Sequence, residues 1–499
     1  MKFLSYFLLI LFVSIPVVFA GKKPSIIFLF ADDQRADTIG AHGNPHIQTP
    51  NLDRLSEEGV SFLRNYCAGS FSGAVCVASR AMLMTGHHWK TIKQKPKNWG
   101  AHPLLPARLA EKGGYRTFIV GKWHNGLGTL RRAFSSGKSV YMGGMCDHTS
   151  FQVQDLTDGK LSEKRNAGAF SSTVFADAAI DFVKNTKTDR PFFLYVAFTA
   201  PHDPRNPPEK FRQIYYDKRP PLPKNYLPQH PFKNGPQAMM GRDEGLAAWP
   251  RAKDVISDQL CEYYGLVTHL DEQVGRIMKA VENSPHADNT YLIYTADHGL
   301  AMGSHGLLGK QNVYEQSMAC PLIIRGPGIP AGHTNKSFTY VHDLHATVYA
   351  MADVKAPKGI DAKDLTPLWQ GKSQSVRDSV FLPFQNNQRA INDGRWKLHI
   401  YPKINHRLLF DIQSDPHETN NLANDPKYKA EIKRLEQLMA TWRTRLGDND
   451  PLQFDNPEPK EARYDNAKRT LDVWQPKWIR DKYFGGRNDP NHGPISKSK

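Results

Sequence analysis

The sequence predicts an α/β protein, built on a large and mostly parallel mixed sheet with helices on both faces. Short apolar runs alternate along the chain with amphipathic helical segments, which is the pattern of such a sheet. Near Val380 the pattern changes and predicts a smaller C-terminal α+β subdomain. With 499 residues, the chain is long enough for a large core and an appended unit.

Four apolar runs are predicted to be strands of the large sheet: 25–30, 117–120, 191–199 and 290–295. Each run is followed by side chains that carry chemistry, namely Asp32 and Asp33, Lys122 and His124, His202, and Asp297 and His298. Because open α/β sheets bind ligands at the carboxyl ends of their strands, we expect one composite site. Charged residues also begin ordinary loops, but four endings with complementary chemistry favour the site.

Helical spacing of apolar residues predicts the covering helices 49–59, 104–112, 167–185 and 253–283. The Pro-rich segment 203–250 has no clear period and is expected to be a long loop over the site. Strands are predicted at 379–384 and 396–401. The run 407–411 comes next, and an amphipathic helix through Trp442 follows it. We therefore expect a catalytic domain at 21–375, a subdomain at 376–450 and a surface tail at 451–499.

The first 20 residues have the features of a secretory signal, with Lys2, an apolar run and a small-residue end at Ala20. That run is short for a bilayer crossing, and no later stretch is long enough. We expect an exported bacterial protein, periplasmic or secreted, with no stable membrane span. Five cysteines do not make a disulfide scaffold, and the sequence leaves the pairing of four of them open: Cys67, Cys146, Cys261 and Cys320.

The formal net charge is +16, from 65 Lys and Arg against 49 Asp and Glu. Such a balance favours a polyanionic partner. No helix-turn-helix, zinc-finger or base-stacking motif is present, and an exported protein rarely meets nucleic acid, so no nucleic-acid partner is expected. A sulfated polysaccharide fits both the charge and the expected location.

Cys76 begins a short apolar helix and Arg80 follows one turn later, within the segment CVASRAMLMTG. The helix N-terminus and Arg80 together create an anion-attracting field at this cysteine. Taken alone, this pattern favours a buried structural cysteine with an incidental arginine. The acids Asp32, Asp33 and Asp297 offer hard oxygen ligands that suit Ca²⁺ or Mg²⁺.

The segment that begins at Cys76 resembles the signature of type I sulfatases, a family of the alkaline phosphatase superfamily. That signature has Cys-x-Pro-Ser-Arg and then Thr-Gly; here Ala78 stands at the proline position. Further blocks follow in the family's order, at 32–33, 121–124, 201–202, 295–299 and 309–310. The resemblance spans about 25–330, continues at 409–422 and implies an alkaline-phosphatase-like fold.

In this family the cysteine is oxidised to formylglycine, whose hydrated aldehyde is the nucleophile. The resemblance therefore implies a maturation partner, either a formylglycine-generating enzyme or an anaerobic sulfatase-maturating enzyme. It implies one Ca²⁺ ion held by Asp32, Asp33, Cys76, Asp297 and His298. The implied catalytic residues are Cys76, Arg80, Lys122, His124, His202 and Lys310. Among them His202 protonates the leaving alcohol, and His124 takes the proton whose removal expels sulfate.

The expected substrate is a sulfated polysaccharide or an oligosaccharide derived from it. His305 and Arg389 are predicted substrate contacts, and the segments 125–147, 203–250 and 385–392 are expected to select the sugar. One alternative is a phosphonate or phosphate monoester hydrolase of the same superfamily. Another is a non-catalytic binder of sulfated glycan with unmodified Cys76. The sequence does not indicate the sugar, the sulfate position, exo or endo action, or the oligomeric state.

Overall fold

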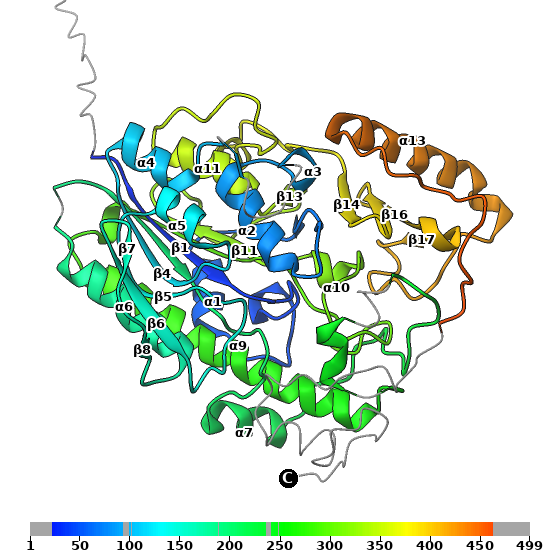
Figure 1. Ribbon diagram of the computed structural model, residues 1–499, viewed down its shortest axis with the longest axis horizontal. Coiled ribbons are helices and arrows are strands. Elements are labelled where there is room, and N and C mark those ends of the chain that lie inside the picture. Colours follow the sequence, from blue (N-terminus) through cyan, green and yellow to red (C-terminus); the bar gives the residue numbers. More distant parts are fainter. Residues whose placement is uncertain are drawn as a thin grey trace, which may run out of the picture.

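The structure is a computed structural model that describes residues 22–92, 99–100, 102–187, 189–235, 241–247 and 249–462. The expected secretory signal and the tail beyond residue 462 lie outside the described residues. Two main sheets are present, a large one wrapped by helices and a small one beside a long C-terminal helix (Figure 1). The fold class is thus an α/β sandwich with a smaller antiparallel unit, as the sequence predicts.

Four parallel strands form the centre of the large sheet, in the order β10 (Thr290–Ala296), β1 (Ser25–Ala31), β9 (Phe192–Ala197) and β4 (Arg116–Lys122). These are the four predicted strands. Every residue of β1 and β9 is buried. A strand covered on both faces needs apolar side chains at every position, so these segments are continuous apolar runs without alternation.

The remaining strands of the large sheet flank this centre. On the β4 side lie β5 (Gly137–Tyr141), β6 (Gln152–Thr157), β7 (Lys160–Leu161) and β8 (Arg165–Asn166). On the β10 side lie β11 (Leu322–Arg325), β2 (Val60–Phe62) and β12 (His333–Asn335). The sheet is mixed because β11 runs antiparallel to both β10 and β2, and β6 runs antiparallel to β5.

Helices cover both faces of the large sheet (Figure 1). One face carries the 30-residue helix α9 (Lys253–Glu282) with α1 (Pro50–Glu57) and α6 (Ser171–Asn185) beside it, and α7 (Glu209–Asp217) packs against α9. The opposite face carries α2 (Val75–Thr85), α3 (Trp89–Ile92), α4 (Leu105–Gly113), α5 (Leu127–Ala133) and α11 (Asp343–Met351). The predicted covering helices are all present.

The small sheet is antiparallel, with β14 (Val380–Phe384), β15 (Gln388–Asn392), β16 (Trp396–Tyr401) and β17 (His406–Asp411) in sequence order. The helix α13 (Lys429–Leu446) packs on it through Leu435 and Met439. Short elements complete the fold: β3 (Asn65–Tyr66) paired with β13 (Thr339–Tyr340), α10 (Glu315–Met318) and α12 (Thr366–Trp369).

One expectation about the architecture is wrong. The segment 203–250 is not an irregular loop, because it contains α7 and a 3₁₀ helix at Arg242–Leu246. Phe211 and Tyr215 of α7 are buried. The prolines that made this segment look irregular in the sequence lie outside the helix. All five cysteines are buried and free of disulfides. Among the described residues, no helix has the length and apolar character that a membrane crossing requires.

Candidate active site

The carboxyl ends of β10, β1, β9 and β4 lie level at one edge of the large sheet. Ala31 is in register with Ala296, and Gly121 with Ala197, so the side chains that follow these strands must meet. At Gly121, where φ is +85°, a side chain would clash with the Ala197 carbonyl. This glycine allows the β-bulge after which Lys122 points at the cluster of acids.

The helix α2 brings Cys76 and Arg80 to the same edge. The Arg80 Nη2 atom lies 3.1 Å from Asp297 Oδ2 and 3.4 Å from Asp32 Oδ1, and its guanidinium stacks on the Phe30 ring. Lys122 Nζ lies 2.5 Å from the other oxygen of Asp32. These side chains are almost completely buried, so solvent screens the attraction between their charges only weakly.

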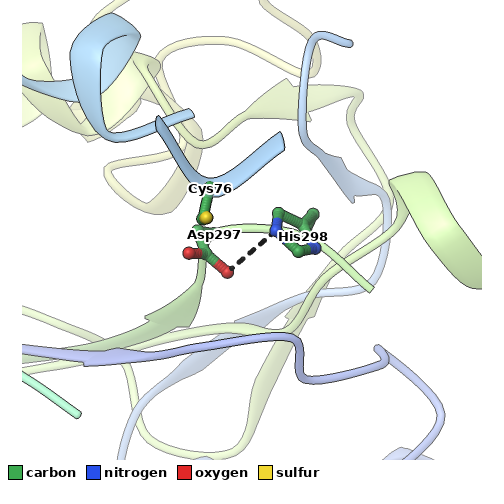
Figure 2. A group of neighbouring side chains, drawn as sticks. All are labelled: Cys76, Asp297 and His298. Carbon is green, nitrogen blue, oxygen red and sulfur yellow. Dashed lines mark ion pairs between the residues drawn. The ribbon is translucent and has the colours of Figure 1, made fainter. Parts of the chain in front are cut away.

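The five predicted metal ligands converge. Oxygen atoms of Asp32, Asp33 and Asp297 lie within 4.8 Å of one another, and Cys76, Asp297 and His298 form a second such group. Figure 2 shows the Cys76 sulfur above Asp297, with the His298 ring beside both. Asp297 belongs to both groups and thus joins all five residues in one cluster.

The residues fit a hard divalent cation. His298 Nε2 is buried without a hydrogen bond, 3.3 Å from an oxygen of Asp33 and 3.6 Å from one of Asp297. Burial lowers the pKa of His298, but Asp297 and Asp33 outweigh it and raise the pKa to about 9. Three carboxylates and one imidazole nitrogen are a mostly oxygen donor set, which suits Ca²⁺ or Mg²⁺.

Lys310 joins this cluster to His202. Its Nζ lies 2.8 and 2.9 Å from the two oxygens of Asp33 and 3.0 Å from His202 Nε2. Asp33, His202 and Asp203 also form a group of possible ligands. The Lys310 ammonium therefore bridges Asp33 and His202.

Cys76 lies against His124, with 3.2 Å between Sγ and Nδ1. Burial raises the pKa of the Cys76 thiol, but Lys122 and His124 lower this pKa by a larger amount. The pKa of Cys76 therefore lies well below its usual value. His124 has a φ of +63°, and a side chain on Gly144 would clash with its ring. The position of Cys76 is therefore electropositive, and the imidazole beside it is fixed.

The sequence patterns do not identify the residues that hold His202. Its Nδ1 lies 2.9 Å from the backbone oxygen of Asp203 and 3.2 Å from the Asp203 carboxylate. Arg242 Nη1 donates to that carboxylate over 3.0 Å. Asp203 could have been found from its place beside His202. Nothing in the sequence pattern marked Arg242, because its segment was expected to be irregular.

A cavity of about 560 Å³ opens above the cluster. Its wall includes Cys76, His124, His202 and Lys310 and, from the missed segment, Arg242 and Asp243. The polar groups at its base are mostly cationic or imidazole side chains. Such a cavity suits a tetrahedral oxyanion presented to the side chain at position 76.

The structure places two predicted substrate contacts outside the lining of the catalytic cavity. Arg389 is fully buried and lies 2.7 Å from carboxylate oxygens of both Asp448 and Asp450, away from the cavity wall. The His305 ring stacks on Tyr314 at 3.8 Å, and its Nε2 lies 3.0 Å from Asn225 Nδ2. Both side chains are occupied by partners within the fold, so neither faces the cavity.

The fold and the site define a hydrolase of the alkaline phosphatase superfamily, with acids and a nucleophile position at the carboxyl ends of a mostly parallel sheet. The family model described as Sulfatase matches residues 24–354. A second model, described as N-sulphoglucosamine sulphohydrolase, C-terminal, matches residues 303–445. The chain belongs to the sulfatase family and is a sulfuric ester hydrolase.

Several known proteins resemble the chain along most of its length. An N-acetylglucosamine-6-O-sulfatase of Bacteroides thetaiotaomicron is 25% identical, over 86% of this chain and 88% of that protein. An ulvan-active sulfatase of Formosa agariphila is 25% identical, over 85% and 82%. A solved structure in complex with its substrate, D-glucosamine-2-N,6-O-disulfate, superposes with a TM-score of 0.73 at 23% identity, over 86% and 99%. This last likeness concerns the fold.

Proposed function

We propose that the protein hydrolyses sulfate esters of a sulfated carbohydrate, with an oxidised Cys76 as nucleophile and one calcium ion at the acid cluster. The observation that carries this proposal is the position of Cys76, against His124 and Asp297 and at the base of a cavity lined by cationic groups. Relatives named for N-acetylglucosamine sulfate and for ulvan support a carbohydrate substrate.

Cys76 must be oxidised because a thiol cannot complete the reaction. A maturating enzyme converts the side chain to an aldehyde, and water adds to give two hydroxyl groups on one carbon. One hydroxyl attacks sulfur, and the other supplies the electron pair that later expels sulfate. A plain thiol or alcohol would remain sulfated after one turnover.

The neighbouring side chains then have separate tasks. Arg80 and Lys122 favour the ionised form of the attacking hydroxyl, and Lys122 and Lys310 neutralise charge on the sulfuryl oxygens. As the bond between sulfur and the sugar oxygen breaks, His202 gives that oxygen a proton. His124 then takes the proton of the second hydroxyl, the carbon–oxygen bond to sulfate breaks, and the aldehyde is restored. Water hydrates the aldehyde for the next turnover.

Asp32, Asp33, Asp297 and His298, with the modified side chain of Cys76, would hold the ion. When bound, calcium supplies a fixed double positive charge beside the nucleophile and the sulfuryl group. Treatment with a chelator should abolish hydrolysis of an aryl sulfate, and added Ca²⁺ should restore it. Metal analysis of the purified protein that finds no divalent ion in a fully active sample would contradict this part of the proposal.

Mass spectrometry of the peptide around Cys76, from the native host, tests the nucleophile. We expect the mass of formylglycine at position 76 and loss of activity in Cys76→Ala. Cys67→Ala is the matched control, because Cys67 is also buried and burial raises the pKa of its thiol to about 12, which makes it inert. Active protein with wholly unmodified Cys76 would refute the mechanism, and inactive unmodified protein would favour the glycan-binder alternative.

The phosphonate alternative is tested by turnover of an aryl sulfate against an aryl phosphonate. We expect the sulfate to be preferred, because the chain belongs to the sulfatase family. A clear preference for the phosphonate would overturn the substrate class. Export of the protein to the periplasm or the medium stays a prediction, since residues 1–20 lie outside the described residues.

A further inference from the structure

A second cavity, of about 480 Å³, lies beside the catalytic cavity. It is formed at the ends of β5 and β6 and by the segment 142–151 that joins them. Tyr141, the last residue of β5, is in register with Lys122 of β4, and the Trp123 backbone N–H donates to its carbonyl over 2.8 Å. The second cavity therefore opens at the same edge of the sheet as the catalytic residues.

The partition between the cavities is the segment 143–145. Met145 lines both cavities, Gly144 lines the catalytic one and Gly143 the second one. A side chain on Gly144 would clash with the His124 ring, and one on Gly143 with the Tyr141 ring and hydroxyl. The Tyr141 hydroxyl donates to the Met145 carbonyl and holds the segment in place. The partition is thin because two consecutive residues have no side chains.

The two cavities differ in chemistry. The catalytic cavity has Lys310, Arg242, His124 and His202 in its wall. The second has one lysine and one aspartate, with amide and hydroxyl groups around an apolar and aromatic surface; its lining includes Lys164, Asp147, Gln152, Gln154, Ser150 and Phe151. Its charges balance. Amides, hydroxyls and a carboxylate beside aromatic rings suit the hydroxyl groups and apolar faces of a sugar better than they suit an isolated anion.

We propose that this second cavity is a subsite for the neighbouring sugar residue of a sulfated oligosaccharide, whose sulfated residue occupies the catalytic cavity. This inference rests on the proposed function. A volume of about 480 Å³ falls within the range of roughly 300–1,000 Å³ that small-ligand sites occupy. The enzyme thus binds its substrate beyond the sugar residue that carries the sulfate ester. A disaccharide is therefore a better substrate than the corresponding monosaccharide.

The test compares kcat/KM for mono- and disaccharide sulfates with that for para-nitrophenyl sulfate, which has no sugar residue to place in the second cavity. Glucosamine sulfates, heparin-derived disaccharides and ulvan-derived disaccharides are the probes. Each is also measured as a competitive inhibitor of para-nitrophenyl sulfate hydrolysis, so that binding is read even where turnover is slow. In the wild type we expect the best disaccharide to bind at least about tenfold more tightly than its monosaccharide, the effect of one or two added hydrogen bonds.

Two substitutions probe the cavity itself. Ser150→Trp should fill it, and Gln152→Ala should remove a hydrogen-bonding group; both residues are exposed. Each should reduce the preference for the disaccharide over the monosaccharide. The matched control is Thr157→Trp, a bulky change at an exposed position of β6 outside the cavity, which should leave the preference as in the wild type.

The possible outcomes separate the subsite from the proposed function. Equal affinity for every disaccharide and its monosaccharide, or an equal loss for both in Ser150→Trp, overturns the subsite. If the wild type hydrolyses neither para-nitrophenyl sulfate nor any sugar sulfate although Cys76 is oxidised, the proposed function fails instead.

Discussion

Among the clusters of buried charge in the described residues, two have a similar composition: one lies at the edge of the large sheet and the other where the small sheet meets it. The first surrounds Asp33 and Asp297. In the second, Lys397 Nζ lies 2.8 Å from Glu315 and 2.9 Å from Glu418, and His399 Nε2 lies 3.0 Å from Glu418. Both clusters combine acids with lysine and histidine, and most of their side chains are buried.

The clusters differ in what their charges face. In the second cluster, Glu418 also accepts the backbone N–H of Glu315 over 2.7 Å, so α10 is fixed to the small sheet. Its members contribute nothing to the wall of the catalytic cavity. At the sheet edge, several carboxylate oxygens converge on one point beneath that cavity. Burial and charge alone therefore do not mark a functional site; convergence on an accessible cavity does.

The largest expected effect is on stability, and it belongs to the second cluster. In Lys397→Ala, Glu315 and Glu418 lose their cation inside the protein. Breaking a buried ion pair in this way costs about 3–5 kcal/mol of unfolding free energy. Denaturant unfolding measures the loss, and kcat per folded molecule should stay near the wild-type value. A variant as stable as the wild type would show that the second cluster is solvated.

The same cluster should make stability depend on pH. Burial raises the pKa of Glu418, but Lys397 and His399 outweigh it, so this pKa lies below its usual value. A carboxyl group with a lowered folded-state pKa stabilises the fold above its unfolded pKa of about 4.3. That contribution is lost as pH falls further, toward the folded-state pKa.

Unfolding free energies measured from about pH 6 downward should show this loss. In Glu418→Gln the dependence on pH should be weaker in the acid range. An identical slope in the two proteins would assign the acid sensitivity to other carboxyl groups.

The third expected effect is on activity, and it belongs to the sheet edge. Lys310 contacts Asp33 and His202 and lines the cavity, so Lys310→Ala removes a cation that faces the sulfuryl group. Loss of one such group costs about 10²–10³-fold in kcat, or roughly 2.7–4 kcal/mol of transition-state stabilisation. Thermal unfolding should change less than in Lys397→Ala, because water in the cavity can solvate Asp33. If Lys310→Ala unfolds as readily as Lys397→Ala, the contrast between the clusters fails.

The contrast between the two clusters also explains which parts of the fold and of the site could be predicted from the sequence. The strand ends were predictable because each apolar run and its polar successor are adjacent in the chain. The partners of Arg389 and His305 are not adjacent: Arg389 pairs with Asp448, which is distant in sequence, and His305 packs on Tyr314 through a turn. An arginine near a predicted site looks the same in the sequence whether it faces a ligand or an internal aspartate. Only tertiary packing separates the two cases.

The smallest expected effect concerns Asp203, which has features of both clusters. It is buried and paired like a member of the second cluster, yet its partner His202 lines the cavity. Asp203→Asn keeps the shape but removes the charge that orients the imidazole and pairs with Arg242. We expect kcat to fall by about tenfold, or roughly 1.4 kcal/mol, for substrates with a poor leaving group.

Para-nitrophenyl sulfate should respond much less, since its leaving group needs little protonation. A series of aryl sulfates of rising leaving-group pKa therefore distinguishes an oriented proton donor from a merely structural aspartate. An equal loss for every member of the series would mean that Asp203 acts only by holding the fold, as Glu418 does.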